Sequence, residues 1–401
     1  MNRTPFDFSA AAAGLPSFRT AAQALPARRE NAARPRRLLA SGLALALGLV
    51  ALPASAAVWW TPTPSVAVGS TSVNVRNAGA RGDGVHDDTA AFQAAINSLP
   101  STGGTVTVPA GRYMINALSS IRMRSHTRLK LDPSAQLVAI PNNQGRSYVV
   151  RVWGVSDVEV TGGQIIGERV KHIGTSGEWG MGVDVRSSKN VYLHDFKVSD
   201  CWGDGVYVGA NGSAGNAVPS TYVTINHIVS NNNRRQGLSL TVVDKVFVYN
   251  SIFSNTHGTA PQAGIDIEPM SQGASSNVRI EKSTMIGNMG NGLVVSTPDT
   301  GLVVKSSTLK QNHGFGVLIM GASKGWIAAN LITENGLDGV GLLKGTHDMK
   351  VTSNTITYNS TRWFYANNKS IYTLTNSARD VQIDSSTYNI FQASNTLSPR
   401  P

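Results

Sequence analysis

Five segments in the second half of the chain begin with glycine and carry aliphatic residues at alternate positions: Gly237-Leu238-Ser239-Leu240, Gly264-Ile265-Asp266-Ile267, Gly292-Leu293-Val294-Val295, Gly316-Val317-Leu318-Ile319 and Gly339-Val340-Gly341-Leu342. Their glycines are 27, 28, 24 and 23 residues apart. A period in the twenties predicts a solenoid in which each repeat forms one coil. A single coil cannot bury its own apolar side, so we expect the coils to stack around one continuous core.

Composition supports an all-β chain. Of 401 residues only 15% are charged, 40 are glycine, and the formal net charge is +11. Low charge with many turn-forming residues favours strands joined by tight turns over helices. The positive charge indicates either an acidic partner or a contribution to solubility alone. Cys201 is the single cysteine, so no intrachain disulfide forms, and we expect a buried, small apolar residue there.

The first 56 residues have the features of an export signal. A basic flank, Arg34–Arg37, precedes an apolar run, Leu38–Leu52, and the small residues Ala54-Ser55-Ala56. This order predicts a secretory signal peptide over residues 1–56, cut near Ala56, and a secreted or periplasmic protein with no stable membrane anchor. The alternative is an uncut signal anchor. No later stretch is apolar enough to cross a membrane.

After a predicted linker, 57–72, the residues predict a cap and first coils over 73–124. Asp87-Asp88-Thr89 precedes an amphipathic segment, which predicts a short helix over 88–98. Asp83, Asp87 and Asp88 are interpreted as turn and capping residues. Coils then fill 125–401. Two aromatic segments are predicted to cover the open end of the stack, where a sheet edge would otherwise be exposed: Trp363-Phe364-Tyr365 and Tyr388-Asn389-Ile390-Phe391.

The N-terminal block has a family resemblance. Its ordered elements are Gly82-Asp83-Gly84, Asp87-Asp88-Thr89, Gly103-Gly104-Thr105-Val106 and Pro109-Ala110-Gly111-Arg112-Tyr113. The set resembles the opening of the pectate-lyase-like superfamily, in the branch that holds rhamnogalacturonases, phage tailspike depolymerases and mannuronan C5-epimerases. The resemblance implies a single-stranded, right-handed parallel β-helix, plugged at its N-terminal end by the short helix.

Asparagines recur at the turns, mostly 23–24 residues apart. They are Asn231, Asn255, Asn288, Asn312, Asn335 and Asn359. Stacked asparagines in one turn can hydrogen-bond to the backbone and to each other. We predict a structural ladder.

Alternation along the glycine-led strands separates inward from outward residues. The first outward column reads Asp184, Tyr207, Ser239, Asp266, Val294, Leu318 and Gly341, and the second reads Arg186, Gly209, Thr241, Glu268, Ser296, Met320 and Leu343. Charged and polar residues gather on the first four coils. We therefore predict the functional site there, and a scaffold role for the later three.

The residues that enter these strands enlarge the predicted site. A lengthened loop follows Tyr207 at 210–220, and another precedes Asp266; such loops commonly form the walls of a groove. We predict Asp204, Asp266 and Glu268 as catalytic residues. Predicted substrate-binding residues are Asp184, Arg186, Trp202, Tyr207, Arg234, Arg235, Gln236, Ser239 and His257. The alternative is that these are solvated residues on the outside of a sheet.

The stretch from Gly180 to Glu268 is similar to the catalytic region of the family 28 glycoside hydrolases, the polygalacturonases. Asp204 is the one position that matches a catalytic aspartate of that family. Gln236 replaces its histidine, and Asp266 and Glu268 replace its Arg/Lys pair. The epimerase motif Asp-Pro-His-Glu is not reproduced, because Asp266-Ile267-Glu268-Pro269 stands in its place. The scaffold therefore transfers from these families, while their specific chemistry does not.

The leading functional prediction is an exported glycosidase that cleaves a polysaccharide with paired carboxylates. The alternatives are a lyase or C5-epimerase acting on a uronate polymer, with Arg235, Tyr207 or His257 as base, and a non-catalytic glycan-binding solenoid. We predict no cofactor and no bound metal, with calcium required only under the lyase alternative. The predicted partner is a polysaccharide, acidic in view of the arginines, and not a nucleic acid. Oligomeric state stays open.

Overall fold

The fold was analysed in a computed structural model that describes residues 58–269, 271–296, 298–361 and 380–398. The chain divides into two units, Met1–Ala56 and Ala57–Pro401, and all described residues belong to the second. The predicted signal peptide and the segment Trp363–Tyr365 lie outside the described residues. No helix within the described part of the chain is long and apolar enough to span a membrane.

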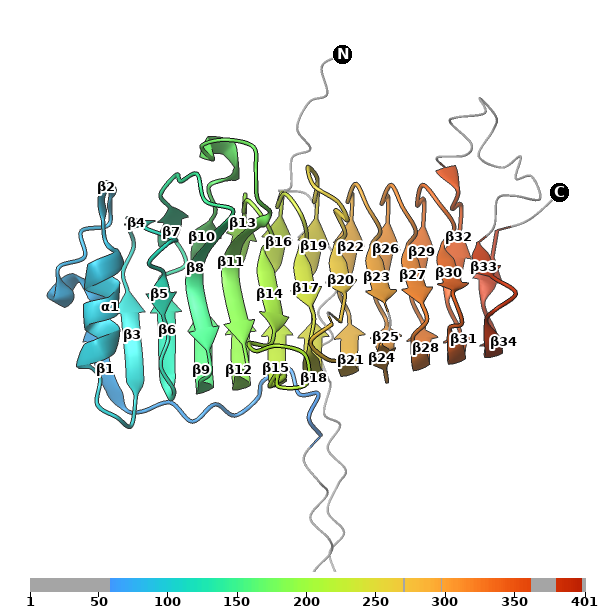
Figure 1. The fold of residues 1–401 in the computed structure, drawn as a ribbon, viewed down its shortest axis with the longest axis horizontal. Helices are drawn as coiled ribbons and strands as arrows, with labels where there is room; N and C mark the ends of the chain where they lie inside the picture. Colours follow the sequence, from blue (N-terminus) through green and yellow to red (C-terminus); the bar gives the residue numbers. More distant parts are fainter. Residues whose placement is uncertain (1–57, 270, 297, 362–379, 399–401) are drawn as a thin grey trace, which may run out of the picture. The chain divides into compact units, whose positions relative to one another are not determined.

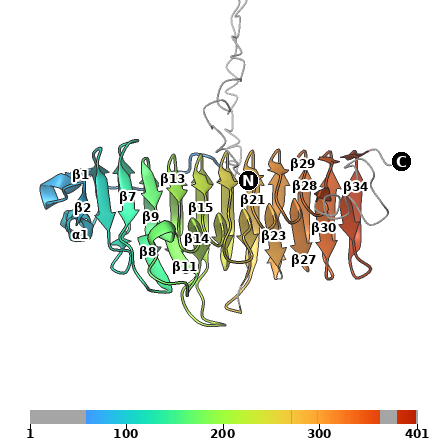
Figure 2. The same ribbon diagram turned by 90° about the horizontal axis from the view of Figure 1, so that it is seen from above.

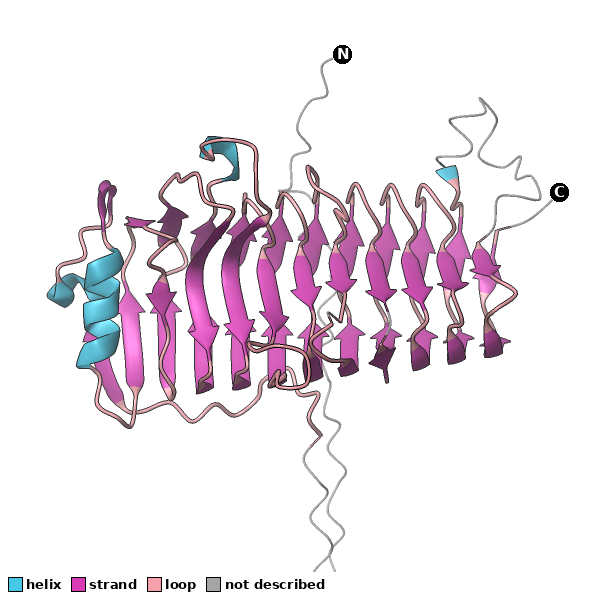
Figure 3. Cartoon of the chain, viewed as in Figure 1, coloured by secondary structure: helices cyan, strands magenta, loops and turns pink. Residues whose placement is uncertain are grey.

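The second unit is a stack of coils, as predicted (Figure 1). Each coil contributes strands to three parallel sheets, which in the described residues contain 13, 12 and 10 strands. Strands dominate every coil, and helix is confined to short pieces (Figure 3). The predicted all-β parallel β-helix is therefore confirmed.

The three sheets are named here by size. Sheet 1 consists of β1 (Thr71–Asn74), β3 (Gly104–Val108), β6 (Thr127–Leu131), β9 (Ser156–Thr161), β12 (Lys189–His194), β15 (Ser220–Asn226), β18 (Val243–Tyr249), β21 (Ser275–Glu281), β24 (Asp299–Thr300), β25 (Val303–Lys305), β28 (Ser323–Ala328), β31 (His347–Thr352) and β34 (Tyr388–Ala393). Sheet 2 consists of β2 (Asp83–Asp87), β4 (Arg112–Ile115), β7 (Gln136–Ala139), β10 (Gln164–Ile166), β13 (Lys197–Ser199), β16 (Val229–Asn231), β19 (Ile252–Ser254), β22 (Thr284–Ile286), β26 (Thr308–Lys310), β29 (Leu331–Thr333), β32 (Thr355–Thr357) and β35 (Thr396–Leu397). Sheet 3 consists of β5 (Ile121–Arg122), β8 (Arg146–Trp153), β11 (Trp179–Arg186), β14 (Val206–Gly209), β17 (Leu238–Leu240), β20 (Ile265–Ile267), β23 (Leu293–Ser296), β27 (Val317–Met320), β30 (Val340–Leu343) and β33 (Val381–Ile383).

The N-terminal cap is the helix α1 (Thr89–Ser98), which lies at the end of the stack (Figure 1). Its buried side includes Phe92, Ala95 and Ile96, all fully buried. The two aspartates before it act differently. Asp87 accepts hydrogen bonds from the backbone and hydroxyl of Thr89, whereas the Asp88 carboxylate accepts from the backbone N–H groups of Arg81 and Gly82. Both are turn and capping residues, as predicted.

The described residues also contain two short 3₁₀ helices, η2 (Val75–Ala78) and η3 (Arg169–Lys171). At the other end of the stack, the segment Tyr388–Phe391 belongs to β34, the last strand of sheet 1. Tyr388 and Phe391 are each 58% exposed, so the prediction that this segment covers the open end is wrong. Hydrogen bonding to β31 makes it a further strand of the sheet.

A buried asparagine ladder joins the later coils. Asn288, Asn312 and Asn335 each donate from the side-chain amide to the side-chain oxygen of the next asparagine, ending at Asn359, at 2.8–2.9 Å. Asn231 and Asn255 bond to each other outside this ladder, and its earlier positions are held by Asn233 and Thr256. The predicted ladder is thus correct for four of its six members.

The ladder explains the repeated glycine. A Cβ atom built on Gly292 would lie 2.7 Å from the carbonyl oxygen of Gly316 and 2.8 Å from the Asn312 amide nitrogen. Real Cβ atoms do not approach other atoms so closely, so a side chain here would separate the coils. Glycine at this position lets successive coils approach and places the asparagine amides beside the backbone.

Replacing one ladder residue is expected to destabilise the fold. Asn312→Ala would remove three buried hydrogen bonds of the Asn312 side chain. Their partners are the Asn288 amide, the Asn335 side-chain oxygen and the Met285 carbonyl. We expect a loss of about 2–4 kcal/mol in the free energy of unfolding, measured by urea denaturation. Asn216→Ala, at an exposed loop position, is the control and should change little. Equal stability of the two variants would contradict a structural ladder.

Candidate active site

Sheet 3 carries the predicted polar column on its outer face. Backbone pairing aligns the whole series: Asp184, Tyr207, Ser239, Asp266, Val294, Leu318 and Gly341. The aliphatic residues between them are buried, among them Val206, Leu238 and Ile265. The inward and outward assignments made from alternation are therefore correct.

The column also extends toward the N-terminal end, where the sequence analysis did not follow it. Asp184 pairs with Arg151, which pairs with Arg122. Strand β8 contains two consecutive buried valines, Val149 and Val150. Because Val149 stands where the later coils have their leading glycine, the repeat pattern did not place Arg151 in the outward column.

Arg235 is the centre of the charged cluster. Its guanidinium contacts three carboxylates through three nitrogens: Nη1 to Asp204 Oδ2 at 3.4 Å, Nη2 to Glu268 Oε2 at 3.3 Å, and Nε to Glu178 Oε2 at 3.7 Å. Burial alone would lower the pKa of Arg235, but the surrounding carboxylates, with Asp204 the strongest, raise it. The guanidinium therefore stays charged. The cluster draws together residues from the entries of β11, β14 and β17 and from the end of β20.

Asp204 lies beneath this guanidinium and is fully buried. Its Oδ2 accepts a hydrogen bond from Ser239 Oγ at 2.7 Å, and its Oδ1 has no hydrogen-bond partner among the described residues. Burial raises the pKa of Asp204 to about 6, although Arg235 and Ser239 both act to lower it. Near neutral pH the carboxylate is mainly ionised and pairs with Arg235.

Asp266 is 2% exposed and lies on β20, two strands of sheet 3 beyond β14, the strand that follows Asp204. Gln236 Nε2 donates to its Oδ2 at 2.5 Å, and the Gln236 amide is itself oriented by the backbone N–H of Ala263, which donates to Oε1. Burial, reinforced by the nearby charge of Glu268, raises the pKa of Asp266 to about 8. Asp266 therefore carries a proton at neutral pH. Gln236 is a partner of this carboxyl group, buried away from solvent.

Asp184 and Arg186 form a second ion pair, in which the guanidinium binds both carboxylate oxygens. Arg186 donates from Nε and Nη2 to the two carboxylate oxygens of Asp184 at 2.7 and 2.9 Å, and Trp153 Nε1 donates to the same group at 3.0 Å. Burial raises the pKa of Asp184, while Arg186 opposes the shift. The Arg186 guanidinium lies 4.5 Å from the ring centroid of Tyr207. This fork holds Arg186 in place over the aromatic ring.

A pocket of about 280 Å³ lies over this face of sheet 3. Its lining contains three arginines, three aromatics, one carboxylate and several neutral polar side chains: Arg146, Arg186, Arg235, Tyr148, Trp179, Tyr207, Glu268, Ser239, Thr241, Ser271 and Gln272. The Gln272 side chain donates to the carbonyl of Gly212, which joins the 210–220 loop to the pocket rim. Loops in the coils around β8, β11 and β14 project further from the stack than those of later coils (Figure 2). The predicted wall at 210–220 is therefore present, whereas the predicted loop before Asp266 contributes no residue to the pocket lining.

Three predicted substrate-binding residues lie away from this pocket. Trp202 is 8% exposed because His172 stacks on its ring at 3.8 Å and the Arg234 guanidinium also lies 3.8 Å from it. Arg234 donates to the carbonyl of Gly177. His257 contacts the carbonyl of Asn255 and Arg169 at a turn. Trp202 is thus a packing residue with a covered ring, which corrects its prediction as a sugar platform, and Arg234 covers it.

Four residues of the site were missed by the sequence analysis: Arg146, Tyr148, Glu178 and Trp179. Arg146 and Trp179 pair across neighbouring strands, and the guanidinium lies 4.3 Å from the indole centroid. All four belong to the irregular segments before or at the start of β8 and β11. The equal spacing of Arg146–Trp179 and Arg151–Asp184, both 33 residues, was the available signal.

The candidate metal ligands are the His, Cys, Asp and Glu side chains. In the ranges that the structure describes, no group of three or more His, Cys, Asp or Glu side chains is placed to hold a metal ion. The predicted lack of a cofactor, and calcium under the lyase alternative, stay predictions.

Comparison with known proteins agrees with the fold. Residues 72–273 match the family model described as rhamnogalacturonase A/epimerase, pectate lyase-like, and residues 263–395 match a right-handed β-helix region. The chain belongs to the rhamnogalacturonase A/epimerase family of pectate-lyase-like proteins. The resemblance inferred from the N-terminal block and the predicted right-handed β-helix are both confirmed.

Individual relatives are distant. The chain is 28% identical over 324 residues to the uncharacterized protein YclG of Bacillus subtilis, covering 72% of this chain and 55% of YclG. It therefore spans about half the length of that relative. Among solved structures, it resembles the A-module of the mannuronan C-5 epimerase AlgE4 of Azotobacter vinelandii (TM-score 0.64, 19% identity, 82% and 96% of the two chains covered) and an exopolygalacturonase of Thermotoga maritima (TM-score 0.52, 11% identity, 82% and 93%). At these identities the two structures show a shared fold.

The raised pKa of Asp266 makes a testable contribution to stability. A folded-state pKa of about 8, against an ordinary 3.8, means that the folded protein binds this proton more tightly than the unfolded chain does. The contribution is complete below about pH 4 and is lost as the pH rises toward 8. Asp266→Asn, which cannot ionise, should therefore be more stable than the parent by about 1–3 kcal/mol at pH 8.5 and not at pH 4.

Urea denaturation at the two pH values measures this difference. Asp299→Asn is a matched comparison, because burial raises the pKa of Asp299 to about 7 at a position on sheet 1, outside the site. Both variants should flatten the pH dependence of stability. A parent-like pH dependence in Asp266→Asn would show that Asp266 is ionised in the folded protein at neutral pH.

Proposed function

We propose that this protein is an exported enzyme that hydrolyses a glycosidic bond in an acidic polysaccharide. The observation that carries the proposal is a pair of solvent-accessible carboxylates, Glu178 and Glu268, on either side of Arg235 and beside the aromatic pocket. Their side chains are 37% and 41% exposed, whereas Asp204 and Asp266 are buried. The glutamates are thus the acidic groups of this cluster that a polymer can touch.

The spacing of the two glutamates suits acid–base hydrolysis. Each binds a different nitrogen of one guanidinium, at 3.7 and 3.3 Å, which keeps their nearest oxygens below the upper limit of the roughly 6.5–9.5 Å used by inverting glycosidases. One carboxyl group would protonate the leaving oxygen while the other, as carboxylate, activates water. Glu268 lines the pocket and is the residue we place nearest the bond that breaks.

Asp204 and Asp266, predicted as catalytic, are better suited to positioning. Asp204 holds Arg235 from below, and Arg235 in turn fixes both glutamates. Asp266 keeps a proton and so adds no second full charge beside Glu268. Paired carboxyl groups with separated pKa values are a recurring feature of acid–base sites.

An acidic substrate is supported by the arginines of the pocket. Arg186 and Arg235 are paired with carboxylates, but Arg146 makes no ion pair within the described residues and lies flat on Trp179. A guanidinium beside an exposed indole can bind a sugar acid group while the sugar ring stacks on the aromatic. The mannuronan epimerase and exopolygalacturonase that share the fold are named for uronate polymers.

The lyase or epimerase alternative requires a base that removes a proton next to a carboxylate. The phenol of Tyr207 stays protonated near neutral pH because burial raises its pKa, and its oxygen is hydrogen-bonded to Thr241 at 3.0 Å. Arg235 stays charged, and His257 is bonded at a turn. These contacts favour hydrolysis over proton abstraction.

Product analysis with glutamate variants tests the proposal. The purified protein is incubated with polygalacturonate, rhamnogalacturonan and alginate, and new reducing ends and unsaturated products are both followed. We expect reducing ends without near-ultraviolet absorbance from unsaturation. Glu268→Gln and Glu178→Gln should each lower kcat by about 10²–10⁴-fold, the usual contribution of a general acid or base, with unchanged thermal stability.

Glu334→Gln is the matched control, because Glu334 is an exposed turn residue that contacts only Gln311 in the described structure, and it should retain full activity. If Glu178→Gln and Glu268→Gln form unsaturated products as fast as the parent does, the hydrolytic assignment is wrong. Full activity of both Glu178→Gln and Glu268→Gln would also contradict it.

A further inference from the structure

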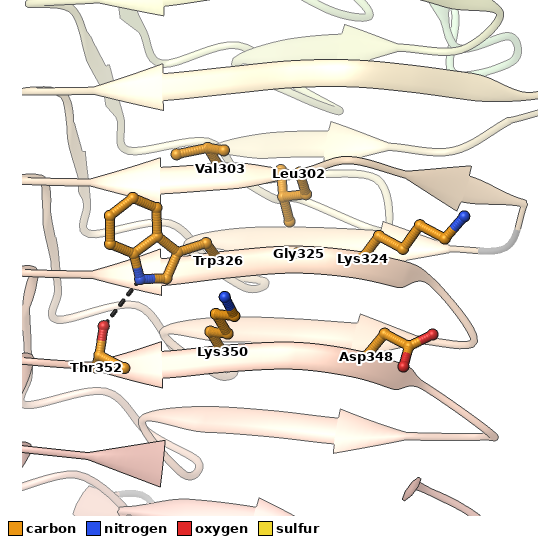
Figure 4. A pocket seen from close by; sticks show the side chains of 8 residues that line it. All are labelled: Leu302, Val303, Lys324, Gly325, Trp326, Asp348, Lys350 and Thr352. Carbon is orange, nitrogen blue, oxygen red and sulfur yellow. Dashed lines mark hydrogen bonds between the residues drawn. The ribbon is translucent and has the colours of Figure 1, made fainter. Parts of the chain in front are cut away.

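A second hollow lies on a different face of the stack, on the outer side of sheet 1. It has a volume of about 480 Å³ and spans the coils of β25, β28 and β31. Figure 4 shows its main side chains, which include Val303, Lys324, Trp326, Asp348, Lys350 and Thr352. None of these residues belongs to the site on sheet 3.

The hollow arises where one coil departs from the regular pattern. The sheet 1 strand of that coil is split into β24 and β25, with Gly301 between them in the left-handed region at φ 81°. Leu302 follows, and its carbonyl accepts the backbone N–H of Trp326 in the next coil. The interruption leaves room above the strand that carries Trp326.

Trp326 presents a fixed, exposed ring. The side chain is 38% exposed, and its Nε1 donates to Thr352 Oγ1 at 2.8 Å, the bond drawn in Figure 4. The same outward column continues through Lys350 to Phe391, which is 58% exposed. Two aromatic rings thus flank a lysine, about 9–10 Å apart along the backbone at two strand spacings. This spacing suits alternate sugar rings along one chain.

The hollow has an excess of positive charge. Lys324 and Lys350 line it, and Lys305 Nζ lies 5.7 Å from the Trp326 ring centroid. None of these three lysines forms an ion pair within the described residues. The one acidic group, Asp348, is already held by His347 and Asn389. Three lysines against one occupied carboxylate favour an anionic ligand.

The chain itself covers earlier coils of this face. Residues 58–68 run along sheet 1, with the carbonyls of Ser65 and Pro62 accepting from Asn190 and Asn226, and with Trp60 beside the Arg279 guanidinium at 4.7 Å. Arg279 pairs with Val303, the first residue of the hollow's column. The described part of this segment therefore reaches along sheet 1 to the coil before the hollow.

We propose that this hollow is a second binding site for an anionic polysaccharide, separate from the catalytic pocket, with Trp326 as the stacking platform and the lysines as partners for acid groups. Binding here would hold a long polymer on the enzyme while another stretch occupies sheet 3. The choice of a uronate polymer rests on the proposed function, whereas the existence of the site does not.

The test measures binding of polygalacturonate, alginate and neutral dextran by affinity electrophoresis of the whole protein. The Glu268→Gln background prevents degradation of the polymers. Adding Trp326→Ala or Lys350→Ala should weaken retention by the two acidic polymers at least fivefold, and Trp326→Phe should restore it. Lys282→Ala, which removes a lysine from the same sheet outside the hollow, should bind as the background does. Dextran should not retard any variant.

The same variants without Glu268→Gln separate the two proposals. Trp326→Ala should raise KM for long polymers several-fold and leave the turnover of short oligosaccharides unchanged. Unaltered retention of Trp326→Ala and Lys350→Ala would overturn the second site, as would equal retardation by dextran. Self-association of the parent that Trp326→Ala abolishes, with no polymer effect, would assign the hollow to a second copy of the chain instead. If retention depends on Trp326 while the glutamate variants remain active, the proposed reaction fails and the second site stands.

Discussion

Hydrogen bonding between equivalent backbone positions of successive coils is the constraint on which the structure depends. Every strand of the three sheets finds its partners in the coil before and the coil after, so no coil satisfies its own polar backbone. Side chains at the turns also hydrogen-bond from coil to coil. Each of Asn288, Asn312 and Asn335 donates to the next asparagine in a buried row. Glycine directly before β14, β17, β20, β23, β27 and β30 is required because a Cβ atom at that position would clash with the neighbouring coil.

The stacking also sets the chemistry of the outer faces. Residues about one period apart in sequence become neighbours about 4.8 Å apart, which is why Arg235 meets Asp204, Glu178 and Glu268 from separate coils. Burying carboxylates is costly unless they are paired or protonated. Both solutions occur here, with Asp204 paired to Arg235 and Asp266 holding its proton beside Gln236. The electrostatic cost is met within the cluster, and the two glutamates are left accessible above it.

Departures from the repeat separate functional coils from the regular ones. On sheet 3, the 210–220 loop and the segment before Trp179 build walls around the pocket, whereas the later coils present Val294, Leu318 and Gly341. On sheet 1, the split strand at Gly301 lies beside a hollow, one coil beyond the position of Trp60 in the described N-terminal segment. In both places a coil that breaks its own pattern exposes an aromatic ring with basic neighbours.

Much of this could be predicted from the sequence, because a local period dictates its own stacking. The glycine-led repeats determined the β-helix, and strict alternation within them determined the outward column from Asp184 to Gly341. Prediction failed where the period is irregular: the doublet Val149-Val150 concealed the place of Arg151 in the outward column, and Glu178 and Trp179 precede any repeat signal. Accessibility was also decided only by the tertiary structure. Packing from other coils buries Asp204 and Trp202, which both lie in the segment before a strand, but it leaves Glu268 open to solvent. The sequence could not show this difference, because burial depends on contacts that no single repeat contains.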